Sequence, residues 1–516
     1  MKEIILFYPR PWPGQTMSGR LPYSLLILVA YLQNFGLKVR IIDERTVDNL
    51  RFTIGSLDPN AILLFGISSF TGIQIRNGVN IATLLKHHYP QIPIVWGGWH
   101  PTALPDQTLK HPLVDIIVRG QGEVTLKHLA LALENGKDLT SIEGISYKTN
   151  DTIIHNPDRD LSYDMTKLSM PFEAVDVEKY IYVKPFADNS SRTLGIITSL
   201  GCPNNCGFCQ VAGVYKRRTL FRNMEHILNE IDFLVKKYHV NSFTIDDDNF
   251  FVSHKRVRQF CEALIDRHYS ISWDAGVSVN ILLKNYDDDF LKLIKASGCK
   301  QLYIGAESGS DAVLEMINKN ASVSQTYEFV EKMKKVGIRA SISSMVGLPN
   351  TPDTEMVDTM NMILKCRDLN PDFDFRIFYY TPYPSTFLYT EALKAGMKEP
   401  DSLEQWSEHT LRRFKAPWVK KTNRNQIKYF YYYYYPYSGS IEKNRSAKQP
   451  IDKLIEWIDS TLFENALFRA LARLRVKHRF YKFPLDAFFA IQGKRLKSLY
   501  GRLVHKNIDA FYEFDH

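Results

Sequence analysis

The chain reads SLGCPNNCGFC from Ser199 to Cys209. Three of its six cysteines fall within this stretch, at a C-x3-C-x2-C spacing. A short loop with this spacing can turn three thiolates toward one inorganic cluster. Because iron–sulfur cubanes are usually held by four cysteines, three local cysteines would leave one iron open to a non-protein ligand. Gly201 and Gly207 allow the tight backbone that such a loop needs.

Two other interpretations of the loop are a zinc site and a chance cluster of buried cysteines. Structural zinc takes four ligands, commonly as two C-x2-C pairs or with added histidines. The remaining cysteines, Cys261, Cys299 and Cys366, are scattered singly, and no histidine lies within the loop. The pattern therefore favours an iron–sulfur cluster.

The cysteine loop resembles that of the radical S-adenosylmethionine (SAM) superfamily, in which the open iron binds the amino and carboxylate groups of SAM. The resemblance implies that Cys202, Cys206 and Cys209 hold a [4Fe–4S] cluster. Strand-like and helical runs alternate around the loop, from about residue 190 to 400. As in that superfamily, we expect a partial (β/α)6 barrel with its active site at the carboxyl ends of the strands.

Three further segments resemble the superfamily's SAM site: DDD at 246–248, GAESGSD at 305–311 and VGLP at 346–349. The residues that the resemblance assigns to SAM are Phe208, Asp246, Asp248, Glu307, Val346 and Gly347. Two other interpretations stay open. The acidic triplet could hold magnesium, although such sites usually include phosphates or further carboxylates. Glu307 could instead cap the helix that follows it.

Residues 1–145 alternate strand-like and helical segments, with strands such as Glu3–Phe7, Val39–Asp43 and Ala61–Gly66. Near-continuous apolar strands in such an alternation predict an α/β domain with a doubly wound parallel sheet of the Rossmann or flavodoxin type. Ligands of such sheets bind at the carboxyl ends of the strands. The domain has no G-x-G-x-x-G or P-loop pattern, which argues against a nucleotide dehydrogenase or an NTPase.

The runs GGWHPT at 97–102 and DIIVRGQGE at 115–123 resemble the cobalamin-binding domain that precedes many radical SAM domains. The residues that this resemblance assigns to cobalamin are Ser68, Gly97, Gly98, His100, Gly120 and Glu123. The D-x-H-x-x-G signature is absent, so we do not expect a histidine of that first loop to ligate cobalt. For His100 we expect packing against the ligand or solvent. The alternative is a flavodoxin-like domain without a cofactor, which only shapes the substrate site.

Residues 146–189 are expected to form a linker, and residues 401–516 a mostly helical region of unknown role. The aromatic run YFYYYYYPY at 429–437 could line an apolar substrate pocket or pack against other helices. An amphipathic helix is predicted from Ile451 to Phe468, with basic residues following from Arg469 to Arg479. These residues could touch an anionic membrane surface, although a solvated helix face is the commoner role.

The composition is that of a globular protein of several domains, with 45% hydrophobic and 23% charged residues in 516. A formal net charge of +9 is modest for this length and does not indicate nucleic-acid binding. The chain has few cysteines, no apolar run long enough to span a bilayer and no signal-peptide pattern after Met1. These features favour a reducing cytoplasm.

Together, the resemblances imply an enzyme that cleaves SAM at a [4Fe–4S] cluster and uses cobalamin to methylate an unactivated carbon. The substrate would be a small or lipid-like molecule, and a flavodoxin- or ferredoxin-type protein would supply the electron. One alternative keeps the radical chemistry but ends in cyclisation, rearrangement or coupling, with cobalamin redirected or absent. Another is a non-catalytic electron-transfer or cluster-sensing protein, which would leave the SAM-like motifs without a purpose.

Overall fold

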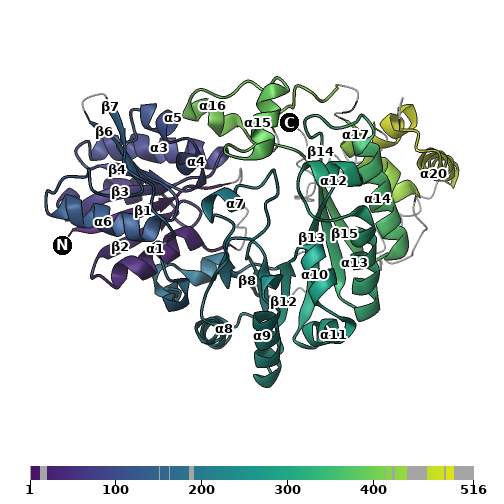
Figure 1. Ribbon diagram of the computed structural model, residues 1–516, viewed down its shortest axis with the longest axis horizontal. Coiled ribbons are helices and arrows are strands. Elements are labelled where there is room, and N and C mark those ends of the chain that lie inside the picture. The colour runs from purple at the N-terminus through teal and green to yellow at the C-terminus, as the bar shows by residue number, and fades with distance from the viewer. Residues whose placement is uncertain are drawn as a thin grey trace, which may run out of the picture.

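The chain forms two α/β units that lie side by side, the first at the left of Figure 1 and the second at the right. A computed structural model describes residues 2–11, 20–149, 152–161, 163–184, 191–411, 413–420, 423, 425–438, 462–481 and 484–492. The first unit contains a seven-stranded sheet and the second a six-stranded sheet. This arrangement confirms the α/β fold class predicted from the sequence.

The first sheet has the order β2-β1-β3-β4-β5-β6-β7, parallel through β5 and closed by an antiparallel hairpin. Its strands are β1 (Glu3–Tyr8), β2 (Lys38–Asp43), β3 (Ile62–Ser68), β4 (Ile94–Gly97), β5 (Ile116–Val118), β6 (Ile145–Thr149) and β7 (Thr152–His155). Its helices are α1 (Tyr23–Gln33), α2 (Leu50–Gly55), α3 (Ile73–His88), α4 (Trp99–Ala103), α5 (Pro105–Lys110) and α6 (Gly122–Glu134). Ile5 and Phe7 of β1 face one core and Ile4 and Leu6 the other, so both faces of the sheet are covered.

The second sheet is all parallel, and each strand pairs with the next along the chain, in the order β8-β11-β12-β13-β14-β15. Its strands are β8 (Thr193–Ile196), β11 (Ser242–Ile245), β12 (Ser272–Gly276), β13 (Cys299–Glu307), β14 (Arg339–Val346) and β15 (Phe373–Tyr379). Its longer helices are α8 (Met224–Tyr238), α9 (His254–Asp266), α11 (Asp288–Ala296), α13 (Val323–Val336) and α14 (Glu355–Leu369). This is the predicted partial barrel. Its mouth carries the short β9 (Ser199–Leu200), which pairs with β10 (Leu220–Phe221).

The two faces of the barrel sheet differ in polarity. On the outer face, Leu194 and Trp273 flank Phe243 in register, and all three are buried in the core beneath the helices. One residue further along each strand, Gly195 and Asp274 flank Thr244. Because side chains alternate across a strand, these small or polar residues face the inside of the barrel. The interior is therefore polar where the exterior is an apolar core.

The segment after β15 returns to the first unit, where α15 (Phe387–Lys394) and α16 (Leu403–Glu408) lie above its sheet in Figure 1. Helix α16 packs against α3. Trp406 has no exposed surface and belongs to the same apolar core as Ile75 and Leu85 of α3. The C-terminal region that the sequence left without a role thus begins as a cover for the first sheet.

The tyrosine-rich run packs on the edge strand of the barrel. It forms α17 (Gln426–Tyr429), the π-helix η7 (Phe430–Tyr434) and α18 (Tyr435–Ser438). The Tyr431 ring stacks on Phe375 of β15 at 5.0 Å, and its hydroxyl accepts from the Ile377 amide at 2.6 Å. An exposed strand edge would otherwise present unpaired amides. Packing, rather than a substrate pocket, is therefore what this run does in the structure.

Helix α20 (Leu462–Lys477) lies at the far right of Figure 1. The helix predicted from Ile451 overlaps it, although residues 451–461 lie outside the described part of the chain. A search of the described residues for a helix of sufficient length and hydropathy to cross a bilayer found none.

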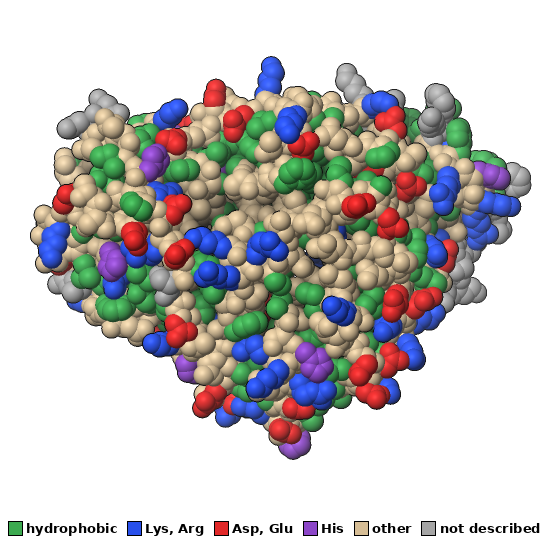
Figure 2. Space-filling view, in the orientation of Figure 1, with side chains coloured by type: hydrophobic (Ala, Val, Ile, Leu, Met, Phe, Trp, Pro, Cys, Tyr) green, Lys and Arg blue, Asp and Glu red, His purple; other side chains and the backbone are tan. Residues whose placement is uncertain are grey.

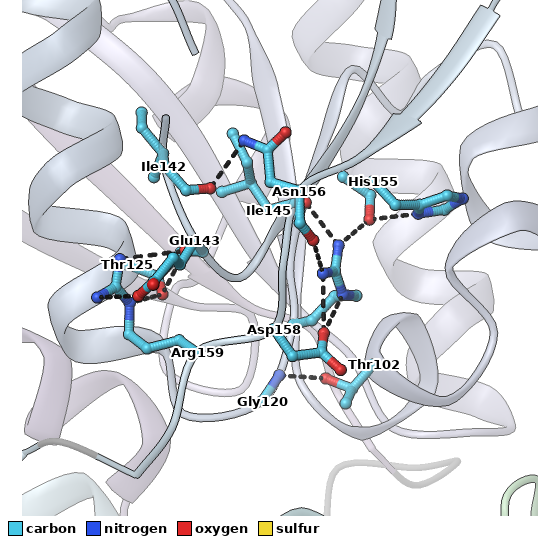
Figure 3. A network of polar contacts seen from close by, with 12 residues as sticks. Thr102, Gly120, Thr125, Ile142, Glu143, Ile145, His155, Asn156, Asp158 and Arg159 are labelled. Atoms are coloured by element: carbon cyan, nitrogen blue, oxygen red, sulfur yellow. Dashed lines mark hydrogen bonds and ion pairs between the residues drawn. The ribbon is translucent and has the colours of Figure 1, made fainter. Parts of the chain in front are cut away.

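The start of the predicted linker is fastened to the first sheet by a polar network (Figure 3). Arg119, which follows β5, donates to the carbonyls of Ile145 and Asn156, both at 2.5 Å, and to Asp158 Oδ1 at 2.8 Å. Arg159 adds a 3.0 Å ion pair with Glu143. Since β6 and β7 continue the first sheet, the linker begins as part of that unit.

Candidate active site

The cysteine loop follows β9 and is fixed to the barrel through its backbone. Gly201 has a φ of +85°, and an added Cβ would overlap the carbonyl oxygen of Arg218. Gly207 donates its amide to the carbonyl of Ile317 at 2.8 Å. Position 201 therefore requires glycine, because an L side chain would be both strained and crowded there.

The three thiols of the loop, Cys202, Cys206 and Cys209, are partly exposed and form no disulfide. Asn249 Nδ2 lies 3.8 Å from Cys202 Sγ and donates to it. Burial raises the pKa of all three thiols, that of Cys209 to about 11. Iron would have to displace their protons, as metals bound to thiols do. Across the described residues, no three His, Cys, Asp or Glu side chains gather closely enough for a single metal ion, whereas three accessible thiols suit a larger cluster with an open iron.

Two carboxylates of the acidic triplet support this loop. Asp247 is buried and accepts from the amide of Thr198 at 2.6 Å and from its hydroxyl at 2.5 Å. Asp248 accepts from the Gly201 amide at 2.7 Å. Both contacts tie the end of β11 to the chain that leads into the cysteines.

Asp246 points elsewhere and contacts the first unit. Arg20 Nε lies 3.1 Å from Asp246 Oδ1. An added Cβ at Gly195 would overlap Asp246 Oδ2 and lie 2.5 Å from the Tyr23 hydroxyl. Burial raises the pKa of Asp246, and the Arg20 charge opposes that rise. The assignment of Asp246 to SAM stays a prediction.

Glu307 and Lys319 form a buried ion pair beside the cysteine loop. Lys319 Nζ donates to Glu307 Oε1 at 2.9 Å, and the two side chains are only 12% and 9% exposed. An added Cβ at Gly305 would overlap Glu307 Oε1, so this glycine makes room for the pair. Lys319 Nζ also lies 5.6 Å from the centre of the Phe208 ring, and its charge opposes the rise in the pKa of Cys206.

The VGLP segment is held at the end of β14 by its own neighbours. Val346 is fully buried, and Gly347 has a φ of +71°. The Gly347 amide donates to Glu355 Oε2 at 3.1 Å, and its carbonyl accepts from Trp418 Nε1 at 2.9 Å. The assignment of Val346 and Gly347 to SAM stays a prediction.

The paired glycines of the first unit bring two loops together. Gly98 has a φ of +101°, and an added Cβ would lie 2.6 Å from the carbonyl oxygen of Ser69. The loop after β3 therefore packs directly on the loop after β4. Ser68 and Gly97, the last residues of these two strands, pair with one another just before the loops begin. Gly120 donates its amide to Thr102 Oγ1 at 3.0 Å and has open space beside its Cα.

His100 is packed inside the protein. It has no exposed surface, its Nδ1 lies 3.1 Å from Thr71 Oγ1, and its ring meets Trp406 edge-on at 5.3 Å. Burial lowers its pKa to about 3, so the ring is neutral. The sequence predicted a loop histidine against ligand or solvent, but the returning helix α16 covers it. Its Nε2 is buried, and no hydrogen-bond partner among the described residues reaches it. Its assignment to cobalamin remains a prediction.

Buried polar atoms near this edge fit a ligand rich in amides. Ser69 Oγ, Gln121 Nε2 and Glu123 Oε2 are buried, and no hydrogen-bond partner reaches them from the described residues. Burial raises the pKa of Glu123 to about 7. Such atoms cost stability unless a ligand or water satisfies them. Together with the open side of Gly120, they match what a corrin ring with amide side chains would need.

The loops of the two units meet face to face. Trp99, after β4, lies edge-on to Tyr215 at 6.2 Å, just beyond the cysteine loop. Phe70, after β3, packs on Tyr383 at 5.1 Å, just beyond β15. The carboxyl end of the first sheet, where doubly wound folds bind ligands, therefore faces the barrel mouth.

Sequence reasoning missed Lys319, Asn249 and Arg20. Lys319 lies twelve residues beyond Glu307, in a segment with no recognised motif. Asn249 directly follows the acidic triplet and could have been included with it. Arg20 comes from the other unit, so only the fold brings it to Asp246.

Comparison with known proteins agrees with this geometry. The family model of the B12 binding domain matches residues 21–130, and that of the radical SAM superfamily matches residues 196–363. An uncharacterized methyltransferase of Pyrococcus horikoshii is 30% identical over 362 residues, 69% of this chain and 75% of that protein. An anaerobic magnesium-protoporphyrin IX monomethyl ester cyclase of Rubrivivax gelatinosus is 28% identical over 389 residues, 73% of this chain and 67% of that protein.

The fold is also similar to a solved structure of the cobalamin-dependent SAM radical enzyme OxsB with aqua-cobalamin and SAM bound. The TM-score is 0.72 at 16% identity, over 99% of this chain and 82% of that one. Fold and site define a two-domain iron–sulfur enzyme. The chain belongs to the radical SAM superfamily, in the group that carries a B12-binding domain ahead of the barrel. Its cofactors are a [4Fe–4S] cluster, SAM and cobalamin.

Proposed function

We propose that this enzyme transfers a methyl group to an unactivated carbon of a small molecule. The observation that carries the proposal is the facing of the two ligand edges, through Trp99 with Tyr215 and Phe70 with Tyr383. A corrin on one edge and SAM on the other would share one reaction space. When bound, the cluster and cobalamin supply the electron and the methyl group, while the protein binds, orients and shields.

In this proposal the loop and its neighbours bind the charged parts of SAM. Cys202, Cys206 and Cys209 hold the cluster, and Asp248 keeps the loop in place. Glu307, which is paired with Lys319, lies where an ammonium and a carboxylate would meet opposite charges. Phe208 covers one side of the site, with Val346 and Gly347 at the far end. The residues we assign to the corrin are Ser68, Gly97, Gly98, Gly120 and Glu123.

The test is a cofactor count followed by a SAM-cleavage assay. Protein purified without oxygen would be reconstituted with iron and sulfide, mixed with hydroxocobalamin and desalted. We expect one corrin and one four-iron cluster to remain per chain, and 5′-deoxyadenosine to form when SAM and dithionite are added. A retained cluster without corrin would contradict the methyl-transfer proposal.

Ring formation is the second candidate, because three of the relatives carry the name of a cyclase. The two outcomes differ in stoichiometry. Methyl transfer consumes two SAM molecules for each methylated product, one as methyl donor and one as radical source. Radical chemistry without a methylated product would favour cyclisation, rearrangement or coupling.

We also propose a cytoplasmic location, where thiols stay reduced, and a flavodoxin- or ferredoxin-type electron donor. Peripheral membrane contact is proposed for α20, where Leu467 and Leu474 are 54% and 55% exposed, one heptad apart. Figure 2 shows Lys and Arg side chains gathered at this end of the molecule. Co-sedimentation with phosphatidylglycerol vesicles, but not with phosphatidylcholine vesicles, is the expected result.

A further inference from the structure

We propose that Arg20 and Asp246 form the substrate-recognition site, and that they bind a group that carries an anion beside a hydrogen-bond donor, as an α-amino acid does. The inference rests on the proposed function and names its substrate class. It also reassigns Asp246, which the sequence predicted for SAM, to the substrate.

Asp246 lies at the carboxyl end of β11, on the inner face of the barrel. Asp246 lies two residues beyond Thr244, so the two side chains point to the same face. Thr244 faces the interior together with its neighbours in register, Gly195 and Asp274. Because position 195 has no side chain, the Asp246 carboxylate and the Tyr23 hydroxyl both reach over it. Any larger residue there would overlap Asp246 Oδ2. Gly195 thus leaves space inside the barrel, just below its mouth, where a substrate would lie.

The Asp246 carboxylate has acceptor positions to spare. Its side chain is only 6% exposed, yet apart from the Arg20 ion pair no donor among the described residues reaches either oxygen. The Tyr23 hydroxyl is also buried with no partner in the described part of the chain. Buried polar groups in native proteins are nearly always satisfied. A ligand that donates an N–H or O–H to Asp246 would supply the hydrogen bond that this carboxylate lacks, and it could also pair with the Tyr23 hydroxyl.

Arg20 offers the complementary half of the site. Its side chain is 63% exposed although it contacts a carboxylate that is almost fully buried. The guanidinium therefore borders open space and has further N–H donors that can meet a carboxylate side by side. Its backbone is fixed, because Arg45 Nη1 donates to the Arg20 carbonyl at 3.0 Å.

The surrounding charges favour a ligand with no net charge. Lys184 and Asp274 form a second ion pair, and the Lys184 charge acts on Asp246. Arg20 and Lys184 thus each pair with one carboxylate at this level of the barrel. A third carboxylate, Asp247, also acts on Asp246, but its own oxygens already accept from Thr198 and Ser199. An added lone anion or cation would leave one charge without compensation, whereas a zwitterion would not. A wholly apolar, lipid-like substrate would leave these groups unsatisfied.

The site is completed only when the two units are together. Arg20, just before α1, and Tyr23, the first residue of α1, belong to the first unit, whereas Asp246 and Asp274 belong to the barrel. The unit that binds cobalamin therefore also supplies part of the substrate contact. Its placement fixes the substrate and the corrin relative to one another.

The test compares three probes that share one carbon chain. Norvaline carries both charges, pentanoate only the anion and pentylamine only the cation. Binding to the reconstituted, cobalamin-loaded protein would be followed by saturation-transfer NMR without oxygen. We expect norvaline to bind in preference to the other two, and R20Q and D246N each to weaken it by about tenfold or more. R40Q is the matched control, because Arg40 is an exposed arginine of the first unit paired with Glu3.

Several results would overturn the inference. Norvaline could fail to bind the intact protein, pentanoate could bind equally well, or D246N could lose SAM binding while retaining norvaline. Y23F is a milder variant that keeps the packing of the ring. We expect it to weaken norvaline binding by a smaller factor than R20Q or D246N does. Retained cluster and corrin absorption confirms that each variant is folded. SAM cleavage without norvaline binding would reject this site alone, whereas loss of both corrin and SAM cleavage would reject the proposed function.

Discussion

The cysteine loop and the ligand edge of the first sheet are built in different ways. The loop is one short stretch whose ligands, glycines and carboxylate supports lie close together in the sequence or directly across one strand. The edge is assembled from three separate loops, which follow β3, β4 and β5, and the close approach of Ser69 to Gly98 is made by backbone. The fixed thiols that a cluster needs are thus provided by one short sequence motif. A large ring can be held by many weak contacts from scattered residues.

The largest effect should follow from removing a cluster ligand. We expect C202A to bind less iron and to form 5′-deoxyadenosine at least about 10³-fold more slowly, because alanine cannot replace the thiolate as an iron ligand. Corrin retention should be unchanged, since the ligand edge of the first sheet is formed by other residues. Loss of the corrin together with the cluster would show that the two sites are not independent.

Next comes the backbone of the loop. In G201A the new Cβ would meet the Arg218 carbonyl at a positive φ. We expect most of the cluster to be lost and the free energy of unfolding to fall by about 3 kcal/mol. G213A is the control, because Gly213 has open space around it. Equal iron content in the two variants would contradict the role of Gly201.

The corresponding change at the edge should affect the other cofactor. G98A places a Cβ 2.6 Å from the Ser69 carbonyl oxygen. We expect weaker corrin retention with normal iron content, and a loss of about 2 kcal/mol in the free energy of unfolding. G136A shares the positive φ but has open space, so it separates crowding from backbone strain. Iron loss in G98A would contradict the expectation that the two sites are independent.

The smallest effect concerns Glu123, whose pKa is raised to about 7 by burial. As pH rises from about 4.5 to 7, the unfolded chain loses this proton and the folded protein keeps it, so folding stability falls. In E123Q, which has no carboxyl group to titrate at position 123, this fall in folding stability is absent. We expect this variant to match the parent near pH 4.5 and to be more stable by about 1–3 kcal/mol above pH 7. Parallel stability–pH curves from chemical denaturation would contradict the shift.

The sequence predicted what short-range patterns determine. The C-x3-C-x2-C spacing located the cluster loop, and the alternation of apolar strands with helices predicted both sheets. The acidic triplet was located but treated as one group. Its three side chains leave the chain in different directions, so Asp247 and Asp248 support the loop while Asp246 meets Arg20.

What the sequence did not show depends on packing between distant segments. Trp406 buries His100, and Arg20 reaches Asp246, only because the chain returns across both units. Nothing in the local pattern around His100 distinguishes a ligand from a covered side chain. Similarly, the tyrosine run could be assigned to the edge of β15 only after the strand order was known.

The two cofactor sites face one another in a single enzyme. Pulsed EPR on protein that holds both cob(II)alamin and a reduced [4Fe–4S] cluster tests this arrangement directly, because each centre carries one unpaired spin. We expect a dipolar interaction that alters both signals and disappears in C202A. Two signals identical to those of protein loaded with either cofactor alone would contradict it.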